Sequence, residues 1–460
     1  MKLNIIVASM TVLGLVSCPV LAAHSAKHKM KHQTTVARDY KDMGSLPEVC
    51  TISPDTLVLV SRTQNMGRSL PNPCNPGWFN RIQISGGVNV DLGKFGNRNQ
   101  NIMGENYQRF SLNDAYLNVA ANVSDWAKAF ASLSYNTATI NAPASTIATG
   151  GGTVKAEYDA AYSNNVSSGS TSSVQLEQAF ATFGNFDVSP FYIQVGKQFA
   201  DFSSYQLHPI TESLTQVLSE VLATAGKVGF VASGFNGSIY AFDDPISKVG
   251  QSTSTTNYGA NLGFGAPSDQ FGWDVGISYL YNMIGANNVA YIVNQNNATQ
   301  AFYTPVAGAV SNPGYNTRVS AGAFYADINT GPFSLAGRYT SALEKFNVLD
   351  APKNLSSALS SIAGTGGTGA KPWAAGLTAA YAFDAWCKSQ SIYLGYQASG
   401  QAAYLTLPKS RWMLGYGVEL FGKGTSVGIE WDHDNAYSNS NGGNNNNTNL
   451  VSVRSSVAFG

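Results

Sequence analysis

The predicted strands of this 460-residue chain are joined by segments that are alternately short and long. Between runs in which apolar and polar residues alternate, the tight joins fall at 122–125, 184–189, 234–236, 266–270, 329–332, 384–390 and 421–424. The long joins fall at 93–107, 137–173, 201–225, 244–256, 283–316, 343–371, 401–410 and 434–448. A closed antiparallel barrel that crosses an outer membrane has this arrangement, because its periplasmic turns are short and its extracellular loops are long.

Period-two alternation predicts which face of each strand meets lipid. In the first strand the apolar face is formed by Ile82, Ile84, Val88 and Val90. The segments around 273–281, 411–420 and 451–459 repeat the pattern, whereas 174–183 and 317–328 alternate poorly. The joins delimit sixteen strands, and an even number returns both ends of the barrel to the periplasm.

Composition supports a membrane barrel over a set of soluble domains. Only 12% of the residues are charged, and after the first 25 residues no stretch is apolar for the length of a membrane helix. We therefore predict an all-β fold, a transmembrane antiparallel β-barrel of about 16 strands at 80–460, in the outer membrane of a Gram-negative bacterium. Basic and acidic residues balance at 27 each, which argues against nucleic acid as a partner.

The first residues have the pattern of a secretory signal peptide, predicted at 1–22. Lys2 precedes an apolar run at 3–16, and small residues lead to a cleavage site after Ala22. A second interpretation stays open, because 15–18 has the spacing of a lipoprotein processing site with Cys18 as the lipidated residue.

A separate piece at 23–79 is predicted to be a periplasmic N-terminal extension. Its basic, His-rich start at 24–32 suits a flexible tether, or binding of a metal ion or an anionic polymer. Cys50 and Cys74 are predicted to form a disulfide, because the compartment is oxidising. Cys387 is left over in a short join, where a small buried or interfacial role is favoured over a reactive thiol.

The third long loop has a helical pattern unlike its surroundings. Its apolar residues recur at intervals of three and four: Ile210, Leu214, Val217, Leu218 and Val221. Two placements are open: the loop folds into the lumen and narrows it, or it lies as a helix over the rim. In the first case the constriction would hold the acidic residues Asp201, Glu212 and Glu220.

Charged residues recur at strand positions predicted to face the lumen. The basic candidates for lining a pore are Arg81, Lys128, Lys197, Arg338, Arg411 and Arg454. The acidic candidates are Glu177, Asp274, Glu419 and Glu430, with Asp91 and Asp114 on the same faces. Charged rings bias the passage of charged solutes, so we predict an Arg-rich wall opposite an acidic loop. Each charge could equally be a solvated lumen residue paired across strands.

No pattern of catalytic residues is present. His433 lies between Asp432 and Asp434, and His208 precedes a proline, but neither has a nucleophile at a suitable spacing. We therefore expect no enzyme activity, no cofactor and no metal site.

Three segments carry a resemblance to a known family: LEQAFATFG at 176–184, FYIQVGKQ at 191–198 and HPITESL at 208–214. Over the barrel the chain resembles the outer-membrane siderophore porin family of the legiobactin-receptor type. The resemblance implies a sixteen-stranded barrel that moves ferric siderophore without a large plug domain.

The expected function is passive or facilitated uptake of small solutes through a channel, with ferric siderophore as the solute that the resemblance implies. The alternative is a surface-exposed adhesin or antigen whose loops bind host or ligand. Expected partners are outer-membrane lipid, the solute, further copies of the chain, and the barrel-assembly machinery, which would read Phe459 near the C-terminus. The other seven long loops are rich in small and polar residues and are predicted to be mobile and surface-exposed.

Overall fold

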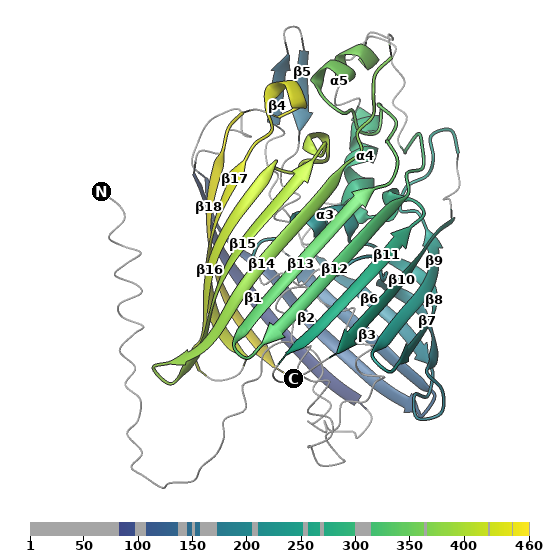
Figure 1. Ribbon diagram of the computed structural model, residues 1–460, viewed down its shortest axis with the longest axis vertical. Coiled ribbons are helices and arrows are strands. Elements are labelled where there is room, and N and C mark those ends of the chain that lie inside the picture. The colour runs from purple at the N-terminus through teal and green to yellow at the C-terminus, as the bar shows by residue number, and fades with distance from the viewer. Residues whose placement is uncertain are drawn as a thin grey trace.

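Sixteen strands form one closed antiparallel barrel, which confirms the predicted fold (Figure 1). The computed structural model describes residues 82–96, 107–136, 145–149, 152–156, 173–204, 210–251, 256–266, 271–299, 314–362, 366–421, 424–443 and 445–459. The predicted signal peptide, the extension, Cys50, Cys74 and Arg81 lie outside these residues.

Each barrel strand pairs with its neighbours in sequence, except that β3 pairs with β6 and β1 closes the ring against β18. The strands are β1 Ile82–Gly96, β2 Tyr107–Ser124, β3 Ala127–Asn136, β6 Ser173–Phe183, β7 Phe191–Phe199, β8 Leu222–Ala232, β9 Phe235–Asp243, β10 Thr256–Ala266, β11 Gly272–Leu280, β12 Ala321–Thr330, β13 Phe333–Ala342, β14 Trp373–Ala385, β15 Lys388–Gly400, β16 Ser410–Glu419, β17 Thr425–Asn435 and β18 Thr448–Phe459. The long join between β3 and β6 carries a separate hairpin, β4 Ser145–Thr149 and β5 Gly152–Ala156.

The two faces of the wall differ as the alternation predicts. Outward side chains such as Ile84, Ile277 and Leu377 are more than half exposed in the isolated chain, as lipid-facing residues must be. Strand β6 alternates poorly because its register against β3 shifts between Ser132 and Leu133, which leaves Glu177 as an extra residue. Among the described residues no helix is both long and apolar enough to span a bilayer.

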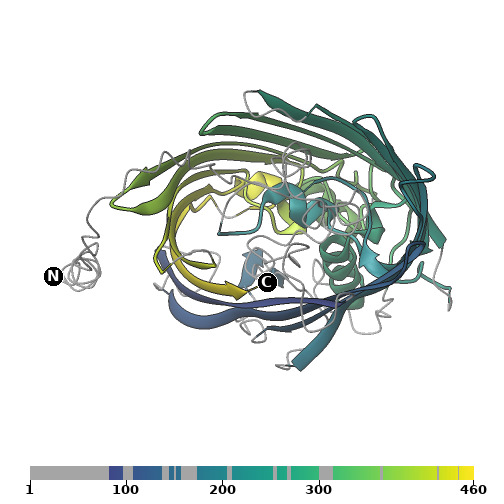
Figure 2. The same cartoon turned by 90° about the horizontal axis from the view of Figure 1, so that it is seen from below.

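The long joins contain short helices: α3 Leu214–Ser219, η3 Met283–Gly285, α4 Asn287–Thr299, α5 Leu355–Ile362, η4 Ala403–Leu405 and η5 Asn439–Asn441. Seen along the barrel, α3 and α4 lie inside the ring of strands (Figure 2). The third loop therefore folds inward, which decides between the two placements left open by its sequence.

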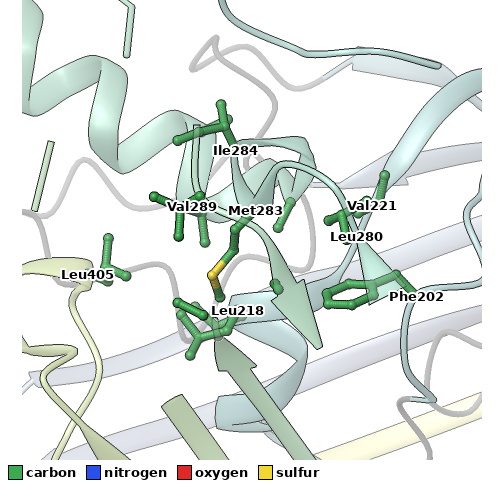
Figure 3. Packing of buried hydrophobic residues seen from close by; sticks show 14 of the residues in the cluster. Phe202, Leu218, Val221, Leu280, Met283, Ile284, Val289 and Leu405 are labelled. Carbon is green, nitrogen blue, oxygen red and sulfur yellow. The ribbon is translucent and has the colours of Figure 1, made fainter. Parts of the chain in front are cut away.

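An apolar core fills one side of the lumen (Figure 3). The third loop contributes Phe202 and Leu218, the fifth contributes Met283 and Ile284, and the seventh contributes Leu405, all of them buried. The sixth loop adds further residues, beginning at position 346. All loops except the third were predicted to be mobile surface segments. That prediction is wrong for the fifth, sixth and seventh loops, because each buries apolar side chains in this core.

Candidate functional site: a loop held inside the barrel

The third loop, described at residues 200–204 and 210–221, is the candidate site because these residues lie in the lumen. Its base is closed by a hydrogen bond from the Ala200 amide to the Val221 carbonyl, at 2.8 Å. All six residues of α3 are buried, and the Ser213 hydroxyl caps the helix by accepting from the Gln216 amide at 3.2 Å. A side-chain cap of this kind satisfies one of the amides that a helix start leaves without a partner.

Glu430, on the inner face of β17, binds the loop segment just before α3. One carboxylate oxygen accepts from the Ile210 amide at 2.7 Å and from the Tyr393 hydroxyl at 2.6 Å. The other accepts from the amide and the hydroxyl of Thr211, at 2.8 and 2.7 Å. The Glu430 side chain is fully buried, so these four donors replace the water it would otherwise bind.

Arg411, on β16, holds the next residue of the loop by its backbone. Its Nη1 donates to the Glu212 carbonyl at 3.1 Å, while Nε and Nη2 grip Asp434 of β17 at 2.7 and 2.8 Å. A bidentate guanidinium–carboxylate pair fixes the orientation of the third donor. Gln397, on β15, accepts from the Leu214 amide at 2.7 Å, so the row of wall contacts follows the loop.

Arg338, on β13, makes the corresponding contact nearer the beginning of the loop. Its Nε donates to the Ser204 carbonyl at 2.9 Å, and its two Nη atoms bind Asp327 of β12 at 2.9 and 3.0 Å. The Arg338 side chain is completely covered. Both arginines therefore bind backbone carbonyls of the loop and acids of the wall.

The acidic residues of the loop do not form one cluster opposite the arginines. Asp201 pairs with the wall beside it, accepting from Lys227 at 3.2 Å and Ser238 at 2.5 Å. Glu212 accepts from Asn288 of α4 at 3.3 Å through one oxygen, and no described residue bonds to the other. Glu220 accepts from Gln216 at 2.5 Å. All of these acids are buried.

The surroundings of the Glu212 carboxyl favour its protonated form. Burial raises the pKa of its carboxyl well above the usual range, and the nearby Glu220 raises it further. Asn288 and Arg411 act in the opposite direction but do not compensate. The loop therefore carries a carboxyl group whose ionisation is costly in its present position.

The remaining candidates lie along the wall. Arg454 pairs with Asp91 across β18 and β1 at 2.8 Å, and Glu177 accepts from Ser132 at 3.4 Å. Asp274 lies 3.5 Å from the Tyr325 hydroxyl. The remaining three are Lys128 at the inner face of β3, Lys197, and Glu419, which is exposed at the end of β16.

Lys197 differs from its predicted placement. It shares the parity of the outward-facing Ile193 and Val195, and its ammonium donates to the Leu176 carbonyl at 2.8 Å. A glycine with φ of 132° directly precedes it, at the extracellular end of β7. A pore-lining role for this and the other predicted residues stays a prediction.

Sequence reasoning missed the neutral residues that complete the site. Gly415 leaves space for the Tyr393 ring, because a Cβ there would come within 1.9 Å of the ring. Gly428 likewise leaves space for Ile210, at 3.2 Å. Inward glycines that alternate with apolar outward residues were the signal for these close approaches. Within the described ranges no group of His, Cys, Asp and Glu could hold a metal ion.

Comparison with curated proteins finds relatives of low identity. The chain is 26% identical over 270 residues to a UPF0422 protein of Coxiella burnetii, covering 58% of this chain and 52% of that protein. It is 24% identical over 274 residues to a UPF0422 protein of Legionella pneumophila strain Lens, covering 58% and 47%. The chain thus spans about half the length of the curated relatives it matches. No protein-family model matches.

Among solved structures, the chain is similar to OprB of Pseudomonas putida in a structure at high pH. The TM-score is 0.53 at 11% identity, over 82% of this chain and 94% of that one. This likeness concerns the fold. The closed sixteen-stranded barrel with an apolar outer face and inward-folded loop is the porin-like architecture of the Gram-negative outer membrane.

Proposed function

We propose that this protein is an outer-membrane channel for small solutes, constricted by its third loop. The observation that carries the proposal is the row of contacts from Glu430, Arg411, Gln397 and Arg338, which holds the loop inside the lumen. A loop meant only for contact with a host would not need anchoring to the inner wall.

The distribution of polar and apolar residues supports a path along one side. The strands that contribute to the apolar core are β8, β9 and β11–β14. The inner wall of β1, β2 and β3 carries the polar Ser85, Asn89, Asp91, Asn118 and Ser132 beside the aromatic Tyr116 and Phe130. The charged pair of Asp91 with Arg454, at 2.8 Å, lies in this wall.

Planar-bilayer recording of the purified protein tests the proposal. Steady unitary current steps support a channel. Arg454→Gln should shift the reversal potential in a salt gradient, because it leaves the Asp91 charge uncompensated. Lys353→Gln is the matched control, because it removes one exposed positive charge from the sixth loop and leaves the Asp91–Arg454 pair intact. Absence of current from correctly folded barrels, together with loop-dependent binding to host cells, would favour the adhesin alternative.

Ferric siderophore is a finer proposal that rests on the resemblance of the three sequence segments. Deletion of the gene should slow growth when ferric siderophore is the iron source, and expression of the intact chain should restore it. Unchanged iron uptake after deletion would contradict this solute while leaving the channel proposal standing. Trimer or other self-assembly stays a prediction, to be measured by the mass of the protein in detergent.

A further inference from the structure

Loops 4 to 7 (244–255, 281–320, 343–372 and 401–409) contain more basic than acidic residues. These loops contain three acidic residues, of which Asp244 and Asp350 are buried and hydrogen-bonded by asparagine side chains, leaving Glu344 exposed. Their six basic residues are Lys248, Arg318, Lys345, Lys353, Lys371 and Lys409. The rim above this half of the barrel is therefore cationic.

The basic residues of the inner wall, in contrast, are paired with carboxylates. Lys227, Arg338, Arg411 and Arg454 each lie within 3.2 Å of a carboxylate oxygen. In the part of the chain that the structure describes, none of the six loop cations has a carboxylate within ion-pair distance. Arg318 is partly balanced by the electrostatic attraction of the buried Asp244, whereas the loop lysines have no described ion pair.

Three of the loop cations lie just beyond the upper ends of adjacent strands. The hydrogen bond from the Leu343 amide to the Ser320 carbonyl, at 2.7 Å, continues the β12–β13 register past both strand ends. Arg318 lies two residues before Ser320 and Lys345 two residues after Leu343, so both cations lie just beyond this last paired position. The β13–β14 register, in which Ser341 faces Trp373, sets Lys371 beside Leu343, one diagonal step from Lys345. Like charges gathered at neighbouring strand ends repel, so an anion bound between them would stabilise the arrangement.

An aromatic belt lies directly below these cations. The Arg318 guanidinium donates to the Tyr281 hydroxyl at 2.9 Å and lies 5.2 Å from the centre of its ring. Tyr281 stacks on Tyr258, which is 48% exposed on the outer face of β10. On the neighbouring strands, Tyr339 stacks with Trp373. Aromatic belts mark the level of the lipid headgroups. The upper ends of β12, β13 and β14 lie side by side on one face of the barrel (Figure 1).

We propose that Arg318, Lys345 and Lys371 form a binding site for the phosphate groups of a phosphorylated glycolipid in the outer leaflet. Guanidinium and ammonium donors on three adjacent strands match the several oxygens of such a headgroup, and the aromatic belt packs against its acyl chains. The exposed position on the lipid side, at headgroup level, favours a lipid over a solute that enters the lumen.

The test measures binding of fluorescent lipid A carrying both phosphates to the purified barrel in a neutral detergent. The triple variant Arg318→Gln, Lys345→Gln and Lys371→Gln should bind on the order of 100-fold more weakly, because each basic residue near an anionic headgroup contributes about a fivefold factor. The matched control is Lys248→Gln, Lys353→Gln and Lys409→Gln, which removes the same charge elsewhere on the rim and should change the affinity less than about threefold. Heat-dependent gel mobility verifies that both variants are folded.

Dephosphorylated lipid A should bind the wild-type barrel as weakly as the triple variant binds the phosphorylated form. The proposal is overturned if the control weakens binding as much as the triple variant does, or if removal of the phosphates has no effect. It is also overturned if inorganic pyrophosphate binds as tightly as the lipid, because the site would then belong to a soluble anion.

Discussion

Replacing Glu430 by Gln should release the segment of the third loop just before α3 from the wall. Each carboxylate oxygen of Glu430 accepts one backbone amide, from Ile210 or Thr211, and one hydroxyl. A glutamine keeps one acceptor oxygen, so whichever way its amide points, one backbone N–H faces an NH₂ group. The hydroxyls can rotate to accept, whereas the backbone amide cannot.

The cost follows from these contacts. An unsatisfied buried donor costs about 1–3 kcal/mol, and a hydrogen bond to a charged group contributes about 1.5–3 kcal/mol. Removing the Glu430 charge also relieves repulsion from the neighbouring Asp432 carboxylate, to which the Thr211 hydroxyl also bonds at 3.0 Å. We therefore expect the free energy of local opening to fall by about 3 kcal/mol, toward the lower end of the sum.

Hydrogen exchange measured by mass spectrometry on a peptide spanning 210–220 reports this opening directly. A loss of about 3 kcal/mol should speed exchange on the order of 100-fold, since 1.4 kcal/mol is a factor of ten. Glu419→Gln is the matched control, because that glutamate is exposed at the end of β16 and should leave exchange unchanged. Exchange in the Glu430→Gln variant within about threefold of wild type would refute the idea that this carboxylate holds the loop.

Three further substitutions test other parts of the site. Gly415→Ala places a Cβ within 1.9 Å of a tyrosine ring and should destabilise the barrel by about 2 kcal/mol, seen as a lower midpoint of heat-dependent gel mobility. Gly417→Ala meets only a serine hydroxyl at 3.3 Å, so an equal loss there would contradict the steric account. Because burial raises the pKa of Glu212, the folded barrel binds this proton more tightly than the unfolded chain does, and stability falls as pH rises from about 4.3 through the raised pKa. Glu212→Gln should remove that fall in urea titrations, and parallel slopes for variant and wild type would disprove it. Leu218→Ala, in the lumen core, should cost about 2–5 kcal/mol of unfolding free energy, whereas Leu359→Ala, exposed on α5, should cost little; similar losses would argue against a packed core.

The barrel was predictable because its two surroundings act on alternate residues. Lipid outside and polar or packed groups inside impose period two on every strand, and turn residues mark the ends. The predicted joins agree with the observed strand ends to within a few residues, as at 184–189 between β6 and β7. The alternation did not predict the facing of β6, because a bulge at Glu177 shifts the register there. No residue type in the sequence indicates this bulge.

The third loop was predictable in type but not in extent. Its apolar period begins at Ile210, yet the helix begins at Leu214. The reason is that Ser213 keeps an extended backbone (φ −74°, ψ 149°) as the N-cap, so the helix begins after it. Glu430, about 220 positions away in the sequence, binds the amides of Ile210 and Thr211 to the wall. No local sequence pattern can reveal a contact with a wall residue at that separation.

The helices of the other loops show the same limit in part. In α5, Leu355, Ala358, Leu359 and Ile362 have helical spacing that the sequence does display. In contrast, α4 has only a weak apolar stripe, and its helical state depends on packing against the third loop, where the Asn287 amide donates to the Glu220 carbonyl at 2.9 Å. Tertiary contact, which sequence period does not encode, decides such a segment.

These contacts make the constriction an assembly of loops. Asp350 of the sixth loop accepts from Asn297 of α4 at 2.9 Å and from the Asn316 amide at 2.9 Å, so it ties the fifth and sixth loops together. Asp244 of the fourth loop ties Asn282 and Tyr315 of the fifth in the same way. A third loop that moved alone would expose the apolar core it shares with α4. If the loop is released from Glu430, its movement must therefore stay limited to the segment around residues 210 and 211. A larger movement would have to carry the neighbouring loops with it.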